Sequence, residues 1–106
     1  MKVVVIGGGP SGVTSAIFAK NNGNSVVLLE RNDKVLKKLL ITGNGRCNYF
    51  NENFSIEHYY SNDIDILKEI ITSGNRDLFL EFFNDLGIVS FIKNDYYYPY
   101  SNMASS

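Results

Sequence analysis

The chain has 106 residues, of which 44% are hydrophobic and 20% are charged, which is the composition of a globular protein and the length of one domain rather than two. Its net charge of −1 gives no reason to expect nucleic acid or an anionic membrane as a partner, and no apolar run approaches the roughly 20 residues that span a bilayer. The single cysteine, Cys47, excludes an internal disulfide framework and is typical of a reducing cytoplasm.

The first 30 residues have the pattern of a strand, a glycine turn, a helix and a second strand. Residues 3–6 (VVVI) form an unbroken apolar run, which predicts a strand buried on both faces of a parallel sheet. The run leads directly into Gly7-Gly8-Gly9-Pro10-Ser11-Gly12, and residues 13–22 then follow a helical pattern. Gly23 stands where a left-handed residue often ends a helix, and residues 25–29 (SVVLL) predict the second strand.

The glycines match the dinucleotide-binding fingerprint G-x-G-x-x-G at Gly7, Gly9 and Gly12. In this fingerprint the first glycine permits a tight turn, the second lets a pyrophosphate approach the backbone, and the third lets the helix pack closely on the strand. The free N–H groups at the start of the helix then face the phosphates. Glu30 follows Gly12 after seventeen residues and ends the second strand, where a carboxylate can accept both ribose hydroxyls of an adenosine.

The alternatives for this unit differ in the ligand that they imply. A glycine turn that merely connects strand and helix is disfavoured, because fingerprint, strand, helix and acid all stand at the expected offsets. A P-loop is excluded because Val13 and Thr14, rather than a lysine, follow Gly12. Glu30 disfavours a 2′-phosphate, since two negative groups would repel each other. The unit therefore favours FAD or NAD over NADP and does not choose between those two.

A second glycine turn, Thr42-Gly43-Asn44-Gly45-Arg46-Cys47-Asn48, follows a basic segment. Half of the chain's ten basic residues lie in this region: Arg31, Lys34, Lys37, Lys38 and Arg46. Backbone N–H groups and a guanidinium in such a loop can clasp a diphosphate, and we expect this role for Arg46. The three lysines are explained more simply as a solvated surface, although Lys38 is kept among the candidate cofactor residues.

These segments resemble the N-terminus of a bacterial flavoprotein family, described as NAD(P)/FAD-dependent oxidoreductases that are aminoacetone-oxidase-like or related to bile-acid enone reductases. The resemblance rests on residues 7–12 (GGGPSG), 28–31 (LLER) and above all 37–48 (KKLLITGNGRCN), and residues 98–106 (YPYSNMASS) resemble a later Pro-x-Ser-x-x-Ala segment. It implies that the first unit binds the adenosine and pyrophosphate of FAD, that the second glycine turn also lies against the cofactor, and that NAD(P)H is a candidate electron donor in the complete protein. Leu36 departs from the family's pattern, in which glycine is common.

The rest of the chain predicts two helices and a β-hairpin. Apolar residues recur at helical spacing from Asp63 onward, and Ser73-Gly74-Asn75 interrupts them, with Asn75 as the expected N-cap of the second helix. That helix carries a phenylalanine stripe, which we expect to pack in a core rather than against a partner, and Gly87 is expected to end it. Strand-like residues on both sides of Asn94-Asp95 predict the hairpin.

No residue can be named as a catalytic acid, base or nucleophile. Cys47 lies beside an arginine, as reactive thiols do, but a small residue packed in a tight turn is the simpler explanation. His58, the only histidine, is expected on the surface of a connector over residues 51–62. No Cys/His set for a metal is present. Tyr96-Tyr97-Tyr98 fits stacking on a flat ligand and packing over the helices equally well.

We therefore expect an α/β fold, with a Rossmann-like βαβ FAD-binding unit in residues 1–48 and two helices and a β-hairpin in residues 49–106. Because no further strand–helix–strand unit follows Glu30, we expect an incomplete domain. It would be the N-terminal part of a cytoplasmic FAD-dependent oxidoreductase, inactive as it stands. A non-enzymatic remnant that binds nucleotides weakly and an NAD-only Rossmann protein are the alternatives, and neither substrate nor oligomeric state is predicted. The expected cofactor-binding residues are Gly7, Gly9, Pro10, Ser11, Gly12, Glu30, Arg31, Lys38, Thr42, Gly43, Asn44, Gly45, Arg46 and Asn48.

Overall fold

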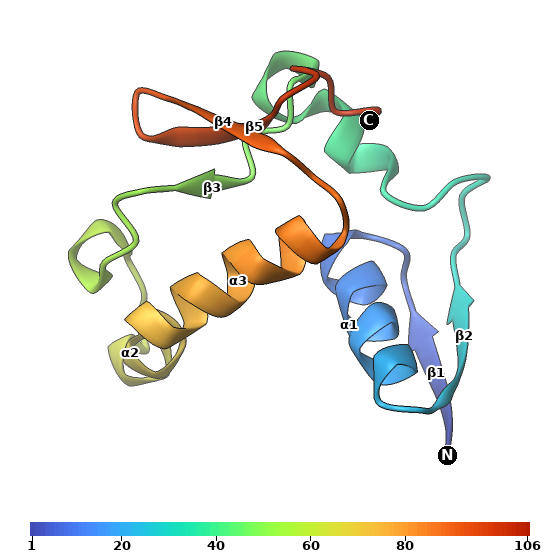
Figure 1. The fold of residues 1–106 in the computed structure, drawn as a ribbon. Helices are drawn as coiled ribbons and strands as arrows, with labels where there is room; N and C mark the ends of the chain where they lie inside the picture. The colour runs from blue at the N-terminus through green and yellow to red at the C-terminus, as the bar shows by residue number, and fades with distance from the viewer. The chain divides into compact units, whose positions relative to one another are not determined.

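The computed structural model describes residues 1–106 as two compact units. The first consists of residues 1–47 together with Ser105, and the second of residues 48–104 together with Ser106. Both units contain helix and strand (Figure 1), so the expected α/β class is confirmed. No helix in the chain has the length and apolar character needed to cross a bilayer.

Two parallel strands form the sheet of the first unit. β1 (Lys2–Ile6) pairs with β2 (Ser25–Leu29) in a register that sets the first residue of one strand beside the first of the other. Val5 faces the helix between the strands, and alternate residues of both strands are half-buried on this side. On the other face Ile6 is 85% exposed and Leu29 is 53% exposed. The prediction that the first strand is buried on both faces is therefore wrong within these residues, because the helix covers one face.

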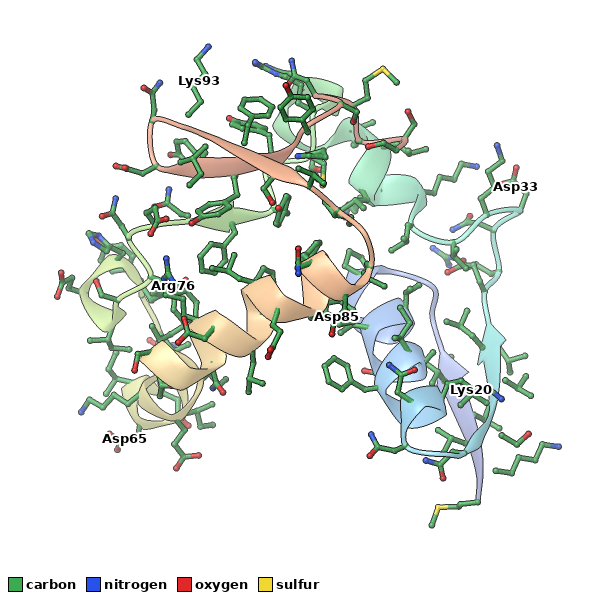
Figure 2. All side chains as sticks on the ribbon, in the orientation of Figure 1. Lys20, Asp33, Asp65, Arg76, Asp85 and Lys93 are labelled. Carbon is green, nitrogen blue, oxygen red and sulfur yellow. The ribbon has the colours of Figure 1, made fainter.

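The connecting helix, α1 (Pro10–Asn21), lies beside the two strands (Figure 1). It begins three residues before the predicted span 13–22, because Gly9 is extended and Pro10 takes the first helical position, where its missing N–H is no loss. Lys20 lies in its last turn (Figure 2). Gly23 is left-handed (φ 80°) and its N–H donates to the carbonyl of Lys20 at 3.0 Å, so the predicted end of the helix is confirmed.

Three antiparallel strands form the sheet of the second unit. β5 (Tyr96–Pro99) lies in the middle, between β3 (Phe50–Asn51) and β4 (Ser90–Lys93). Asn94 and Asp95 connect β4 to β5 with φ angles of 51° and 67°, which are the left-handed values that a two-residue hairpin turn needs. The predicted hairpin is confirmed. β3 was not predicted, and only its second residue lies in the predicted connector, because a two-residue strand is too short to show an alternating pattern.

Two helices, α2 (Ile64–Ile70) and α3 (Ser73–Asp85), belong to the second unit. The predicted N-cap of α3 is wrong: Thr72 is the N-cap, and its hydroxyl accepts a hydrogen bond from the N–H of Asn75 at 3.1 Å. The side-chain amide of Asn75 donates instead to the carbonyl of Ile70, at 2.8 Å, and so ties the end of α2 to the first turn of α3. Gly87 follows α3 with a φ of 78°, as predicted.

Aromatic side chains make the core of the second unit. Phe50 and Tyr97, neighbours on β3 and β5, are each only 8% exposed. The ring of Phe79 on α3 stacks on Phe50 with centroids 5.1 Å apart, and Phe83 stacks on Tyr49 at 4.4 Å. Phe79 and Phe83 of the stripe therefore pack against this core, as predicted, while Phe79 remains 37% exposed, and the middle tyrosine of the Tyr96–Tyr98 run is itself buried in the core.

Candidate dinucleotide-binding site

Two of the fingerprint glycines are required by the fold itself. Gly7 has a φ of 98°, which favours glycine, and its N–H donates to the carbonyl of Leu29 at 2.8 Å. A Cβ on Gly12 would lie 1.9 Å from the carbonyl oxygen of Gly7 and 3.6 Å from Cγ1 of Val5. Only a glycine at position 12 therefore lets α1 approach β1 this closely.

Gly9 is different, because nothing inside the chain demands a glycine there. Its φ of −75° and ψ of 179° are open to any residue, and an added Cβ would meet no atom within 4 Å. The first hydrogen bond of α1 runs from the N–H of Val13 to the carbonyl of Gly9 at 3.0 Å, and no side chain caps the helix. The N–H groups of Ser11 and Gly12 thus have no acceptor within α1. This arrangement suits an anion.

Gly8, which the fingerprint leaves free, is buried and holds three segments together. Its N–H donates to Oε2 of Glu30 at 2.6 Å, and its carbonyl accepts from the N–H of Leu36 at 2.7 Å. A Cβ would lie 2.8 Å from Cγ1 of Val35 and 2.9 Å from Oε2 of Glu30. This role of Gly8 was not predicted from the sequence. The fingerprint does not require a glycine at position 8, so the presence of one there was a signal of such a role.

The carboxylate of Glu30 lies beside the glycine turn and accepts hydrogen bonds on both oxygens. Besides the bond from Gly8 to Oε2, Oε1 accepts from the backbone N–H of Asn32 at 2.8 Å and from its side-chain amide at 3.0 Å. The backbone hydrogen bond of Asn32 and then that of Gly8 lower the pKa of Glu30. The carboxylate is therefore ionised at neutral pH and held in place. Asn32 was not among the predicted site residues, because its contact depends on the bend of the loop.

Further residues of interest lie in the segment after β2. Leu36 is left-handed, with φ 56° and ψ 21°, a conformation that favours glycine. Lys37 pairs with the carboxylate of Asp33 at 2.9 Å, and both side chains are exposed. Arg31 and Lys38 are also exposed.

The second glycine turn is closed by its own backbone. It ends a helical segment over Lys37–Gly45 that is interrupted at residues 42–44, where Gly43 and Asn44 are both left-handed with φ 55°. The N–H of Arg46 donates to Gly43 at 3.2 Å, and that of Cys47 donates to Thr42 at 3.0 Å. Cys47 itself is only 7% exposed, which confirms the prediction of a small residue packed in a tight turn.

The predicted site residues fall into three groups. The contacts above bring together the glycine turn, the start of α1 and Glu30. The bond from Leu36 to Gly8 holds the loop that precedes the turn over residues 42–46, and not that turn itself. Asn48 is exposed and belongs to the second unit.

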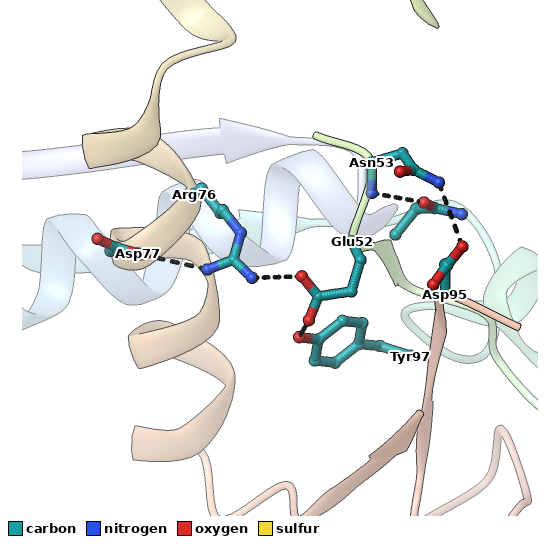
Figure 3. Close-up of polar contacts among 7 residues, drawn as sticks. Glu52, Asn53, Arg76, Asp77, Asp95 and Tyr97 are labelled. Atoms are coloured by element: carbon teal, nitrogen blue, oxygen red, sulfur yellow. Dashed lines mark hydrogen bonds and ion pairs between the residues drawn. The ribbon is translucent and has the colours of Figure 1, made fainter. Parts of the chain in front are cut away.

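A polar cluster in the second unit was not predicted (Figure 3). The carboxylate of Glu52 accepts from the hydroxyl of Tyr97 and, at 2.7 Å, from the guanidinium of Arg76, which also pairs with Asp77 at 3.3 Å. The hydrogen bond from Tyr97 and then that from Arg76 lower the pKa of Glu52. Because these residues come from α3, from β5 and from the residue after β3, the cluster braces the unit. His58 lies apart from it, exposed at the end of a short turn (Ile56–His58).

Comparison with known proteins gives one family and several relatives. The HI0933-like protein Rossmann domain matches residues 1–106. A 3-dehydro-bile acid delta(4,6)-reductase of Clostridium scindens is 36% identical over 107 aligned positions, which cover 99% of this chain and 26% of the relative. Ribosomal RNA dihydrouridine synthases of Escherichia coli and Haemophilus influenzae are 28% and 27% identical, over 80% of this chain and 21% of each relative. The chain thus spans about a quarter or less of the length of these proteins.

Proposed function

We propose, because the chain belongs to the HI0933-like protein Rossmann domain family, that it is the FAD-binding portion of a flavin-dependent oxidoreductase. Membership of a Rossmann family and similarity to a reductase support nucleotide binding in general. The observation that carries the finer proposal is the pairing of an ionised carboxylate, Glu30, with an uncapped helix start at Gly9 across one glycine turn. These two features match the two ends of an adenosine diphosphate, which is the half of FAD that a Rossmann turn recognises.

Each residue of the turn has a defined part in this proposal. The N–H groups of Ser11 and Gly12 donate to the pyrophosphate, and the helix dipole favours its negative charge. Gly9 leaves the space through which the pyrophosphate reaches them. Glu30 accepts hydrogen bonds from the ribose. FAD, when bound, supplies the redox chemistry, while the protein supplies placement and electrostatics.

For the second glycine turn, the proposal of a contact with the cofactor comes from the sequence. Residues 42–46, with Arg31, Lys38 and Asn48, would contact the cofactor from another side. Arg46 would donate to a phosphate oxygen, since guanidinium groups bind phosphates with two parallel bonds. Gly43 and Asn44 are both left-handed, and backbone N–H groups in turns can bind anions.

The flavin ring and the substrate would contact residues that these 106 residues do not supply. Relatives that match this chain extend over about four times its length, given that it covers 26% of the bile-acid reductase. The names of these relatives refer to a bile acid in one case and to ribosomal RNA in the others, so we propose the reaction class and no substrate. Reading the gene beyond codon 106 for an in-frame continuation tests whether one polypeptide supplies the rest.

An NAD-only Rossmann protein is the second candidate, because the glycine turn and Glu30 would serve NAD equally well. The purified protein separates the two candidates. A yellow protein with flavin absorption bands, or one that takes up added FAD in preference to NAD, supports the proposal. A colourless protein that binds NAD in preference to FAD supports the second candidate and contradicts the first.

The role of Glu30 is tested by substitution in that protein. Glu30→Ala should weaken FAD binding about tenfold or more, since hydrogen bonds to a charged acceptor are among the strong ones. Glu57→Ala is the matched control, because the Glu57 side chain is 75% exposed in the second unit and is not in the site. Equal affinity for FAD in the Glu30→Ala and Glu57→Ala variants would show that Glu30 does not bind the ribose.

A further inference from the structure

Most of the hydrogen-bond acceptor positions of the Glu30 carboxylate are already occupied within the protein. A carboxylate offers about four acceptor positions, two on each oxygen. Oε1 already accepts two hydrogen bonds, both from Asn32, and Oε2 accepts one from Gly8. These three bonds leave no more than one position on Oε2, and the backbone N–H of Arg31 also lowers the pKa of Glu30, whereas an adenosine ribose presents two neighbouring hydroxyls.

We propose that the side-chain amide of Asn32 occupies the position of one ribose hydroxyl in the free protein and leaves it when an adenosine nucleotide binds. Asn32 is then a specificity-determining residue, because a ligand with both hydroxyls must displace it and a ligand with one need not. This inference rests on the proposed function, since it assumes that Glu30 is the ribose acceptor.

Of the donors on Glu30, the Asn32 side-chain amide is the one that can move without moving the backbone. The N–H of Gly8 is fixed in a buried turn whose carbonyl is also bonded to Leu36. The backbone N–H of Asn32 is fixed by the chain leaving β2. The side-chain amide bond is exposed and longer, at 3.0 Å against 2.8 Å and 2.6 Å for the other two. Rotation about the Asn32 side-chain bonds releases Oε1 without moving the backbone.

The test compares two probes, ADP and 2′-deoxy-ADP, by titration calorimetry on the purified protein. Replacing Asn32 with alanine removes the competing donor, so Asn32→Ala should raise the affinity for ADP by about two- to tenfold, the range of one net hydrogen bond. The affinity for 2′-deoxy-ADP should not change. Asn22→Ala is the matched control: Asn22 is an exposed asparagine at the other end of α1 whose amide bonds a carbonyl at 2.8 Å, and its loss should change neither affinity.

A second measurement does not depend on a variant. In the nuclear magnetic resonance spectrum of the wild-type protein, the side-chain amide signals of Asn32 should shift on saturation with ADP, while those of Asn22 stay in place. Asn32 signals that do not move would overturn the inference, and so would an Asn32→Ala variant with weaker or unchanged ADP binding.

The two proposals fail in distinguishable ways. A wild-type protein that binds neither ADP nor FAD contradicts the proposed function and this inference together. A wild-type protein that binds both, with the ratio of ADP to 2′-deoxy-ADP affinity unchanged in Asn32→Ala, contradicts the role of Asn32 alone.

Discussion

Replacing Gly12 with alanine tests whether the glycine turn is built on helix–strand contact. The added Cβ would lie 1.9 Å from the carbonyl oxygen of Gly7 and 3.0 Å from its carbon. Both atoms belong to the backbone at the end of β1 and cannot rotate away. Since ordinary van der Waals contact begins near ~3.4 Å, α1 would have to move away from β1 by about 1.5 Å.

The expected loss of stability follows from two opposing terms. Forcing an extra carbon into a packed contact costs about 1–3 kcal/mol, and the rigid neighbours favour the upper end of that range. Alanine is the better helix former by about 1 kcal/mol, which offsets part of the cost. We expect a net loss of about 2 kcal/mol in the free energy of unfolding. At a typical urea dependence of about 2 kcal/mol/M, this lowers the midpoint by about 1 M.

Urea unfolding followed by circular dichroism measures this shift, and Gly9→Ala is the matched control. An added Cβ on Gly9 meets no atom within 4 Å, so its midpoint should stay within the scatter of neutral substitutions, about 0.5 kcal/mol. FAD affinity should fall for both variants. Equal midpoints for Gly12→Ala and wild type would refute the contact on which this account of the turn rests.

Three further predictions concern stability. Leu36→Gly should raise the free energy of unfolding by about 1 kcal/mol, because it relieves a left-handed leucine (φ 56°); Leu40→Gly, at a neighbouring position without a positive φ, should lower it. The pKa of Glu52 lies below its ordinary value of 4.5, mainly through the hydrogen bond from Tyr97. The stabilisation that the ionised Glu52 gives the folded state is therefore present above about pH 4.5 and lost as the pH falls through the lowered pKa. Glu52→Gln should for this reason make the fall of unfolding free energy at acid pH less steep, as measured by urea unfolding. A fall that is equally steep in the variant and the wild type would contradict this role. Thr72→Ala should lower the free energy of unfolding by about 1 kcal/mol, because it removes the N-cap of α3, whereas Thr72→Ser keeps a hydroxyl cap and should lower it much less. Equal urea midpoints for the two variants would disprove the cap.

Local patterns account for the parts of the fold that were predicted. The glycine fingerprint, the apolar strands and the caps at Gly23 and Gly87 depend on neighbouring residues, so a single sequence reveals them. The hairpin at Asn94-Asp95 was predictable for the same reason, since both turn residues tolerate left-handed angles. The N-cap of α3 was misplaced because Thr72 and Asn75 are both good cap residues and only the observed hydrogen bond distinguishes them.

The parts that could not be predicted depend on contacts between distant segments. Gly8 and Glu30 are 22 positions apart, and their hydrogen bond exists because β1 and β2 pair in parallel. The hydrogen bond between Tyr97 and Glu52 joins residues 45 positions apart, and no pattern among neighbouring residues predicts it. The same limit applies to Asn32, whose two bonds to Glu30 require a specific bend after the strand.

Calorimetric titration of the purified protein with FAD, ADP and flavin mononucleotide tests the proposal that the first unit holds the adenosine half of FAD, because the three ligands separate the adenosine half from the flavin half. We expect FAD and ADP to bind at a common site and to compete with each other, while flavin mononucleotide binds far more weakly. Binding of flavin mononucleotide as tight as that of FAD, with no competition from ADP, would rule the proposal out.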